Sequence, residues 1–290
     1  MTKRNCDVLR IDVFTETPRK GNPAGLVLNG DDFTDKEMQQ IAKEANFNET
    51  VFVCSSQIAD LRLRFFMPLK ETELCGHGTI GAIYQLYQGK ASQEITVETL
   101  AGILEVSYDK SKNEVTMKQN HAIFKGFSSD KLELCQLLTI KIEDLSDELP
   151  VIYGNTGVWT LLVPVKTESI LDKMIPRTKE FPNVLKEFPN ASIHPFVILS
   201  ETEASARHFS GFGSGSVEDS VTGTASGVMG AYLLKYVFNE KNQLELLVHQ
   251  GKHLNQEGVV KVRASKNELK TYEVKISGKA CLNGKLTITI

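Results

Sequence analysis

The stretch Cys75-Gly76-His77-Gly78-Thr79 decides the expected fold, because Thr222-Gly223-Thr224-Ala225-Ser226 repeats its pattern. Cys75 and Thr222 are 147 residues apart, which is close to half of the 290-residue chain. Each stretch is a polar turn broken by glycine, directly before an apolar segment of helical character. The repeat predicts a duplicated chain with two similar lobes and a functional site in the cleft between them.

A second pair of segments supports the duplication. Residues 97–102 and 246–251 both follow the apolar helical segments, and both end in glycine. We expect a central helix at about 79–88 in the first lobe and at about 225–236 in the second. Short strand-like segments flank both, which favours many strands around one buried helix in each lobe. The alternative is that two Gly-Thr turns coincide by chance.

The chain is long enough for two domains. We expect an N-terminal lobe at 1–123 and a C-terminal lobe at 124–290, with a last strand, 285–290, that can join the N-terminal lobe. Thr34 and Glu37 form a capping-box pattern before an amphipathic segment, which predicts a helix start there.

The composition excludes several classes of function. The hydrophobic fraction is 41% and the charged fraction is 24%, as in ordinary globular proteins. A net charge of −3 without a basic stripe argues against nucleic-acid binding. No run of residues reaches transmembrane length, so we expect no membrane association and a cytoplasmic location. Five scattered cysteines without a C-x-x-C pair predict reduced thiols and no metal site.

Both repeated turns place unpaired backbone N–H groups at the start of a helix. Such a start also carries the positive end of the helix dipole, so it favours an anion. Two of them facing one cleft are expected to hold a substrate carboxylate. Gly76, Gly78 and Gly223 would allow the close backbone approach, and the N–H of Thr224 would contribute. The alternative is ordinary helix capping by polar side chains.

Acid–base side chains accompany these turns. His77 titrates near neutrality and can donate or accept a hydrogen bond. Asp219 follows Glu218, and two close carboxylates are expected to raise one pKa, which suits proton transfer at neutral pH. Glu49 directly precedes an apolar strand, so it is expected where that strand emerges. The alternatives are a core histidine, a solvated acidic pair and a solvated strand-end glutamate.

Several motifs resemble the PhzF-like phenazine-biosynthesis family. They are Asp12-Val13-Phe14, Gly21-Asn22-Pro23-Ala24, Asn48-Glu49-Thr50-Val51-Phe52-Val53, Cys75-Gly76-His77, Glu218-Asp219 and Thr222-Gly223-Thr224-Ala225. They follow the family's order over about residues 8–227. The resemblance implies an α+β protein with the diaminopimelate-epimerase fold, in which two pseudo-symmetric lobes each form a barrel-like sheet around a central helix. It also implies a cofactor-free isomerase acting on a small acid, commonly as a homodimer.

The resemblance also assigns roles to residues. It implies that Glu49 moves the proton and that His77 and Asp219 complete the catalytic group. Thr224 stands where the family has a serine, which keeps the hydroxyl and adds a methyl group. The expected substrate-binding residues are Asn22, Gly76, Gly78, Gly223 and Thr224.

Cys75 is an alternative base. Diaminopimelate epimerases and proline racemases use two cysteines, one at each turn, and Cys75 stands at the first of these positions. Thr222 stands at the second, and its hydroxyl is a poor base at neutral pH, so two-cysteine racemisation is not expected. A racemase or hydroxyproline-type dehydratase that uses Cys75 alone stays open, as does a non-catalytic small-molecule-binding protein. The structural alternative for Cys75 is a small buried apolar residue.

Overall fold

The computed structural model describes residues 4–214, 216–269 and 271–290. The chain folds into two compact units. One runs from the N-terminal region to Lys118 and includes Ser277–Ile290, and the other is Gln119–Ile276. The sequence analysis placed the division after residue 123 and let only 285–290 return to the first unit.

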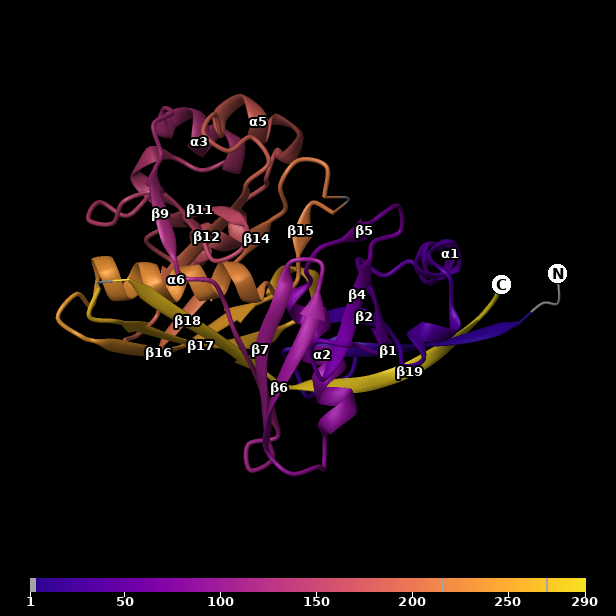
Figure 1. Ribbon diagram of the computed structural model, residues 1–290. Coiled ribbons are helices and arrows are strands. Elements are labelled where there is room, and N and C mark those ends of the chain that lie inside the picture. Colours follow the sequence, from indigo (N-terminus) through magenta and orange to yellow (C-terminus); the bar gives the residue numbers. More distant parts are fainter. Residues whose placement is uncertain (1–3, 215, 270) are drawn as a thin grey trace. The chain divides into compact units, whose positions relative to one another are not determined.

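The first unit is mainly β-structure (Figure 1). Its strands are β1 (Asn5–Val13), β2 (Asn22–Val27), β3 (Thr50–Cys54), β4 (Leu61–Phe66), β5 (Glu71–Thr72), β6 (Gln93–Thr99), β7 (Gly102–Asp109), β8 (Glu114–Lys118) and β19 (Ala280–Thr289). Its helices are α1 (Asp35–Ala45), α2 (Gly76–Tyr87) and the 3-10 turn η1 (Gly30–Asp32). Strand β1 pairs antiparallel with β2 and β19, and β2 runs parallel to β3. Strand β4 pairs antiparallel with β3 and β5 and runs parallel to β6, and β6, β7 and β8 form a meander.

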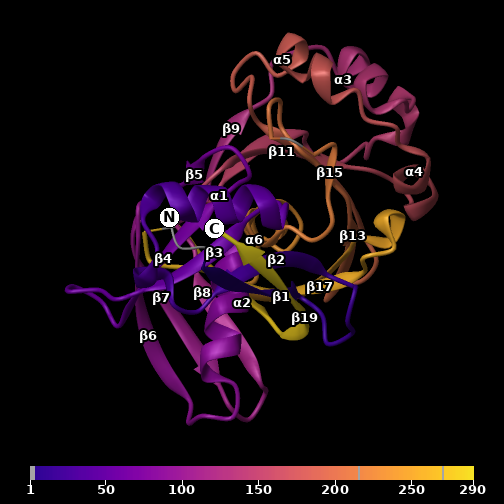
Figure 2. The same cartoon turned by 90° about the vertical axis from the view of Figure 1, so that its right-hand side faces the viewer.

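Helix α2 is the central element of the first unit. It contacts β1, β2, β3, β7, β8 and β19, and these strands lie around it in Figure 2. Thr79 to Tyr84 are all buried, as an apolar helix without a polar face requires. Gly81 permits the close approach of the helix to β1, because a Cβ there would lie 2.9 Å from the Cγ2 of Val13.

The expected capping box of α1 is confirmed. The Thr34 hydroxyl accepts a hydrogen bond from the Glu37 amide, and the Glu37 carboxylate accepts one from the Thr34 amide at 2.8 Å. Four residues of the helix, Met38, Ile41, Ala42 and Ala45, are buried on one face. The helix therefore begins where these two side chains satisfy its free backbone donors.

The second unit contains more helices. Its strands are β9 (Ile123–Gly126), β10 (Ile152–Asn155), β11 (Trp159–Pro164), β12 (Ser192–Ile198), β13 (Glu203–Ala206), β14 (His208–Phe209), β15 (Glu218–Asp219), β16 (Gln243–Gln250), β17 (Gly258–Lys266) and β18 (Tyr272–Gly278), which returns the chain to the first unit. Its helices are α3 (Lys131–Leu138), α4 (Glu168–Lys173), α5 (Phe181–Val184), α6 (Gly223–Tyr236) and the 3-10 turns η2 (Ile142–Asp144), η3 (Thr178–Glu180) and η4 (Lys252–Leu254). Helices α3 and α5 lie beside the region of β11 and β12 in Figure 1, and their Leu134, Leu138 and Phe181 share one core with Leu161 and Ile193.

The two units repeat one topology. In each, an antiparallel pair (β1–β2, β10–β11) continues into a parallel pair (β2–β3, β11–β12). The next strands pair antiparallel and end in a two-residue strand (β5, β15) that leads into the buried helix (α2, α6). A hairpin follows in each unit (β6–β7, β16–β17). Its first strand, β6 or β16, runs parallel to an earlier strand, β4 or β13. The expected α+β fold with two similar lobes is confirmed.

Both central helices begin earlier than the sequence analysis expected. Helix α2 begins at Gly76 and α6 at Gly223, with Cys75 and Thr222 as the N-cap residues. We expected Gly76 and Gly223 in a turn before each helix, but they adopt helical geometry and belong to its first turn. The repeated sequence stretches are therefore the helix starts themselves.

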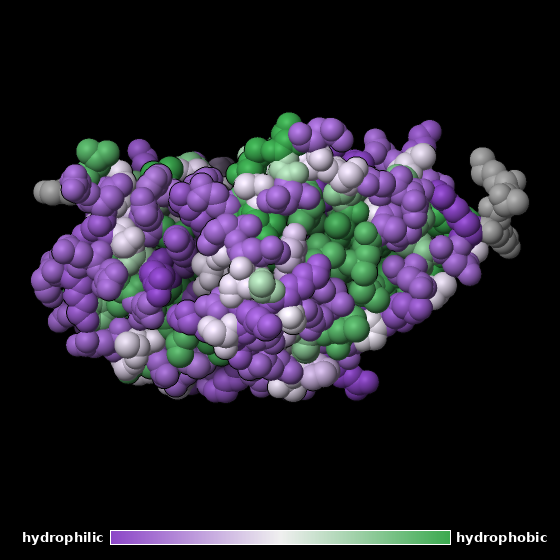
Figure 3. Space-filling model, turned by 60° about the horizontal axis from the view of Figure 1, so that its bottom comes forward, coloured by the Kyte–Doolittle hydropathy of each residue, from purple (hydrophilic) through white to green (hydrophobic). Residues whose placement is uncertain are grey.

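The face shown in Figure 3 is mostly hydrophilic, with smaller hydrophobic areas between polar ones. Leu282 and Leu286 of β19 are among the exposed hydrophobic residues of the chain. Among the described residues, no helix combines the length and the hydropathy needed to cross a bilayer.

Candidate active site

Three chemically active side chains meet at the start of α2. The Nε2 atom of His77 lies 3.5 Å from the Oε2 atom of Glu49. The Sγ atom of Cys75 lies 3.5 Å from the Nδ1 atom of the same imidazole. The His77 side chain is 11% exposed and that of Glu49 is 19% exposed, so both are largely shielded from water. The sequence analysis singled out all three residues, and the fold of the first unit brings them together.

Strand pairing positions Glu49. Its backbone oxygen accepts a hydrogen bond from the Gly25 amide at 3.0 Å, and the next residue, Thr50, begins the parallel ladder between β3 and β2 opposite Gly25. A Cβ at Gly25 would lie 2.8 Å from the Phe47 ring, so this segment packs closely against β2. The carboxylate therefore projects from a fixed strand end.

Cys75 caps α2. Its Sγ atom accepts a hydrogen bond from the Gly78 amide at 3.3 Å, and its backbone oxygen accepts one from the Thr79 hydroxyl at 2.8 Å. A Cβ at Gly78 would lie 2.7 Å from Val51, so this glycine is needed for packing. Since the thiol uses the Gly78 amide, the amides of Gly76 and His77 are the first-turn donors left for an anion.

Burial sets the protonation of His77. Desolvation lowers the pKa of the imidazole below its usual 6.5, and the nearby Glu49 carboxylate opposes this in part. The imidazole is therefore neutral at neutral pH, with one nitrogen that donates and one that accepts. A neutral histidine beside a carboxylate can donate a hydrogen bond to developing negative charge while the carboxylate moves a proton.

A second constellation lies at the start of α6 in the second unit. The Thr222 hydroxyl donates to the Oδ2 atom of Asp219 at 2.6 Å. The Gln250 amide donates to the Asp219 backbone oxygen at 2.9 Å, and its own oxygen accepts from the Thr222 amide at 3.2 Å. At the position where Cys75 caps α2, Thr222 instead turns its hydroxyl to a carboxylate. The Asp219 carboxylate is thus oriented by its own helix start.

Glu218 has a charged partner other than Asp219. The Arg207 guanidinium binds both oxygens of the Glu218 carboxylate, at 2.9 and 2.7 Å, and also donates to the backbone oxygens of Leu171 and Met174. The expected effect of Glu218 on the Asp219 pKa stays a prediction. Glu218 holds β15 in place.

The sequence analysis missed two buried histidines near Asp219. His208 lies opposite Asp219 in the β14–β15 pair, and its Nδ1 atom is 3.3 Å from the Nδ1 atom of His194. Desolvation lowers the pKa of His208 to about 4, and the Asp219 carboxylate opposes this. Burial and the neighbouring His208 lower the pKa of His194 well below its usual value. Neither histidine stands in a motif of acid–base residues, so only the strand pairing reveals them.

The remaining expected binding residues have defined positions. Asn22 is buried and begins β2 directly after Gly21, whose φ of +65° allows the turn. Gly223 is buried in the first turn of α6. The backbone oxygen of Thr224 accepts a hydrogen bond from the Thr156 hydroxyl at 3.2 Å.

The described residues include one group with the composition and spacing of a metal site. It consists of Glu49, Cys75 and His77, whose ligand atoms lie within 4.8 Å of one another. A carboxylate, a thiolate and an imidazole are zinc ligands. This group coincides with the acid–base constellation, so metal binding and proton transfer would compete for the same atoms.

Comparisons with known proteins give matches along almost the whole chain. Residues 11–285 match the protein family described as phenazine biosynthesis-like protein (PhzC-PhzF). The chain belongs to this family. A PhzF-family protein from Bacillus anthracis has a crystal structure with a TM-score of 0.93 and 41% sequence identity, covering 99% of this chain and 100% of that chain.

Other relatives extend the likeness. The uncharacterized isomerase YfhB of Bacillus subtilis is 41% identical over 267 residues, which is 89% of this chain and 90% of the relative. A hydroxyproline epimerase from Agrobacterium vitis has a TM-score of 0.65 at 12% identity, covering 99% of this chain and 93% of that chain, and therefore shares the fold.

Proposed function

We propose that the chain is an isomerase that moves a proton within a small carboxylate-bearing substrate by acid–base catalysis. The observation that carries the proposal is the contact of Glu49 with His77 at 3.5 Å, at the start of a buried helix. The family of the chain, together with relatives that are named isomerases, supports the assignment to the isomerases. The substrate class and the mechanism are our proposal.

In the proposed reaction, Glu49 removes a proton from a carbon that a neighbouring carboxylate or double bond acidifies. The C–H electron pair delocalises into the substrate, and Glu49 returns a proton at another carbon, so no atom is gained or lost. While Glu49 carries the proton, it can exchange it with solvent, so that deuterium enters the substrate in D2O. Neutral His77 donates a hydrogen bond to the charge that develops. The amides of Gly76 and His77 bind the substrate carboxylate.

Asp219 is assigned to the orientation of the substrate on the family motif. The Thr222 hydroxyl and Gln250 fix this residue, which suits a group that orients a substrate. The amides of Gly223 and Thr224 and the Thr224 hydroxyl would bind substrate oxygens. Asn22 is assigned to substrate binding on the family motif alone.

Hydrogen exchange into a panel of candidate acids tests this function. The wild-type protein in D2O is incubated with small unsaturated and cyclic carboxylic acids, and NMR detects loss of a C–H signal. We expect exchange in at least one acid, and at least a ~1,000-fold slower rate for Glu49→Gln. The matched control, Glu44→Gln on the exposed face of α1, should exchange at the wild-type rate. Undiminished exchange in Glu49→Gln would refute the role of Glu49.

A second candidate uses Cys75 as the base of a racemase or a dehydratase. The observation that favours it is the 3.5 Å contact between the Cys75 Sγ atom and the His77 Nδ1 atom. The hydrogen bond from the Gly78 amide to this sulfur favours a capping role instead. If Cys75 is the base, Cys75→Ala or thiol alkylation abolishes exchange and Glu49→Gln does not.

A third alternative is a protein that only binds its ligand, which would show no exchange at all. The turn of Glu49 towards His77 argues against this alternative.

We propose further that the reaction needs no metal or organic cofactor, because its proton donor and acceptor are protein side chains.

The expectations of a homodimer and of a cytoplasmic location also stay proposals. Light scattering during size-exclusion chromatography tests the first, and a molar mass equal to one chain would contradict it.

A further inference from the structure

The sheet of the second unit carries several buried polar side chains, of which the proposed reaction uses only Asp219. The hydroxyls of Thr160 and Ser192 lie 2.9 Å apart, and the Nδ1 atoms of His194 and His208 lie 3.3 Å apart. Asp219 stands opposite His208 in the β14–β15 pair. We call these five side chains the polar row, and all of them belong to the second unit. Because buried polar groups cost stability, such a row calls for a function.

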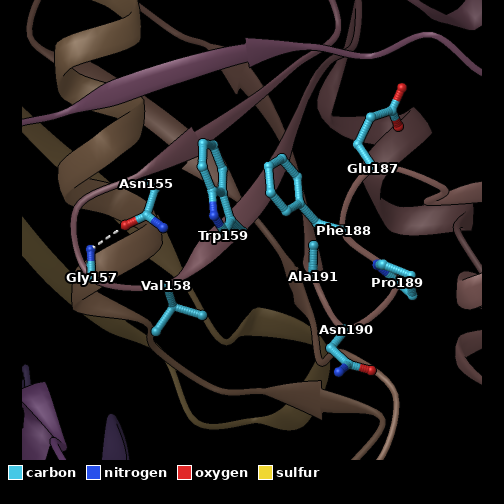
Figure 4. Close-up of a pocket in the computed structure, with 9 residues that line it drawn as sticks. All are labelled: Asn155, Gly157, Val158, Trp159, Glu187, Phe188, Pro189, Asn190 and Ala191. Carbon is cyan, nitrogen blue, oxygen red and sulfur yellow. Dashed lines mark hydrogen bonds between the residues drawn. The ribbon is translucent and has the colours of Figure 1, made fainter.

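The polar row begins next to a cavity of about 420 Å³, which is shown in Figure 4. Residues of the segments 155–159 and 187–191 line this cavity, and Thr160 and Ser192 follow these segments directly along the chain. His194 lies two residues beyond Ser192 in β12 and is completely buried. The histidine pair is therefore a feature of the sheet interior and not of the cavity wall.

Strand register places the two imidazoles on one side of the sheet. Ile193 pairs with Phe209, and both side chains belong to the core to which α3 and α5 contribute. Because side chains alternate along a strand, the neighbouring residues His194 and His208 point to the other side. The imidazole contact therefore forms away from the core of α3 and α5.

Asp219 shares this side with His208. Residues directly opposite each other in an antiparallel pair have neighbouring side chains on the same face. The ion pair of Arg207 and Glu218 lies on the opposite face, since these residues adjoin His208 and Asp219 in their strands. In the strands that pair with β14, the titratable side chains on the side of His208 are therefore His194 and Asp219.

The contact between the two imidazoles restricts the placement of their protons. Burial lowers the pKa of both His194 and His208, so each ring is neutral at neutral pH and carries one N–H. Across the 3.3 Å between the Nδ1 atoms, one ring must donate and the other must accept. The donating ring then has a bare Nε2 atom, and the accepting ring has an Nε2–H.

Two observations select His194 as the donor. Its Nε2 atom is buried and has no hydrogen-bond partner in the part of the chain that the structure describes, so a bare nitrogen costs less there than an N–H. The Asp219 carboxylate opposes the effect of burial on the pKa of His208, and a carboxylate favours an N–H beside it. With His208 as the donor, His194 would bury an unused N–H and His208 would offer the carboxylate only a lone pair.

We propose that His208 is a positioning residue for Asp219. Its Nε2–H donates a hydrogen bond to the Asp219 carboxylate, and the Nδ1–H of His194 fixes it in this tautomer. The Thr222 hydroxyl donates to the Oδ2 atom of the same carboxylate at 2.6 Å, so Asp219 is held both from its helix start and from the sheet. The kinetic effect of this arrangement rests on the proposed function, in which Asp219 orients the substrate.

Nitrogen-15 NMR of the imidazole rings tests the arrangement without any substrate. Long-range proton–nitrogen spectra distinguish the two neutral tautomers, and spectra of His194→Gln and His208→Gln assign the signals. At neutral pH we expect the Nδ1–H tautomer for His194 and the Nε2–H tautomer for His208. The reverse assignment, or a positively charged ring at either position, would overturn the proposal.

Two variants of His208 test where the donor must stand. In His208→Gln the amide reaches the place of Nε2 and can donate to Asp219, whereas in His208→Asn it reaches only the place of Nδ1. We expect His208→Asn to slow hydrogen exchange about tenfold and His208→Gln to stay within about threefold of the wild type. His121→Asn, the same change at an exposed histidine of the second unit, should exchange at the wild-type rate. Equal rates for folded His208→Gln and His208→Asn would contradict a donor at Nε2.

A double variant distinguishes positioning from a general loss of structure. If His208 acts through Asp219, His208→Asn should add little to the loss in Asp219→Asn, because the carboxylate that it holds is already replaced. A further loss of about tenfold in the double variant would show that the effect does not pass through Asp219.

The tautomer measurement and the exchange experiment fail independently. If no acid exchanges, or if exchange does not depend on Asp219, the proposed role of Asp219 is wrong and the tautomers still decide whether His208 holds its carboxylate. If exchange depends on Asp219 but the tautomers are reversed, the proposed function stands and the positioning role of His208 falls.

Discussion

The environment of His77 illustrates how single residues set the chemistry. Burial lowers its pKa, the Glu49 carboxylate opposes this, and the burial effect is the larger of the two. The residue is therefore held neutral beside a carboxylate 3.5 Å away. This pairing gives a hydrogen-bond donor that does not compete with Glu49 for the transferred proton.

Replacement of His77 separates hydrogen bonding from proton transfer. We expect His77→Phe to slow hydrogen exchange about 100-fold, as for the loss of one donor to a developing charge. His77→Gln should recover part of that loss, because its amide donates a similar hydrogen bond. Steady-state rates of exchange measure both, and equal rates for the two variants would contradict a donor role.

The buried His208 makes stability depend on pH. Its pKa is about 4 in the folded protein against 6.5 as the usual value, a difference of about 3 kcal/mol. The unfolded chain binds a proton as the pH falls below about 6.5, and the folded protein does not until about pH 4. The free energy of unfolding should therefore fall by roughly 1.4 kcal/mol per pH unit from this residue alone within that window. His77 and His194 act in the same direction.

Urea denaturation at several pH values checks this prediction. His208→Gln should lose about that slope between about pH 6 and pH 5, and His121→Gln, at an exposed histidine, should keep the wild-type slope. Identical slopes for wild type and His208→Gln would show that His208 is protonated in the folded protein.

The sequence revealed some of these residues and concealed others for physical reasons. Glu49 and His77 stand in motifs of residue types that carry acid–base chemistry. The sequence did not reveal the ion pair of Glu218, because its partner, Arg207, lies between β13 and β14 and local sequence does not connect the two residues. His208 lies in a strand of two residues, which is too short for a periodic pattern.

At the scale of elements, the two central helices illustrate what hydrophobic pattern can and cannot predict. Segments that are apolar all round were expected to be buried helices, and α2 and α6 are. Their starts were misplaced because glycine has a low helix propensity, and the pattern cannot reveal that packing requires it. Val51 leaves no room for a Cβ at Gly78.

The packing of α2 gives a stability prediction. In Gly81→Ala, the new methyl group would lie 2.9 Å from Val13 and 3.2 Å from Ile11. Crowding in a packed core costs about 1–3 kcal/mol, which exceeds the helix propensity of about 1 kcal/mol that alanine adds. With crowding near the middle of that range, we expect a net loss of about 1 kcal/mol in urea denaturation. Gly126→Ala, where a Cβ meets nothing within 4 Å, is the control, and an equally stable Gly81→Ala would contradict the packing described.

At the scale of the whole molecule, duplication has produced two similar units with different chemistry. Equivalent positions hold Glu49 and Ala191 before the parallel strand, and Cys75 and Thr222 at the helix N-cap. The sequence predicted the duplication because helix starts keep a recognisable pattern. It did not reveal the Ala191 position, since only the strand register identifies that equivalence.

The proposed function assigns Asp219 and Glu49 to one reaction, so the two residues should act together. Asp219→Asn, which keeps the size and removes the charge, should slow exchange about 10- to 100-fold. The double variant Glu49→Gln, Asp219→Asn should be no slower than Glu49→Gln alone, because groups that act together are not additive. Multiplicative rate losses would indicate separate roles.

Metal removal tests the proposed cofactor independence. The spacing of a metal site is found in the side-chain atoms of Glu49, Cys75 and His77. A metal ion bound there would block Glu49, the proposed base. We expect dialysis against EDTA to leave hydrogen exchange unchanged and added zinc to inhibit it. Loss of activity on dialysis with recovery on zinc addition would contradict the proposal.

The most direct test of the central claim compares Glu49→Gln and Cys75→Ala in one deuterium-exchange experiment on the same acid substrate. The account predicts that Glu49→Gln loses exchange by at least ~1,000-fold. Cys75→Ala should keep exchange within about tenfold of wild type, because its thiol caps α2 and its loss costs only helix-start stability. Exchange that persists in Glu49→Gln and disappears in Cys75→Ala would contradict the account and assign the base to Cys75.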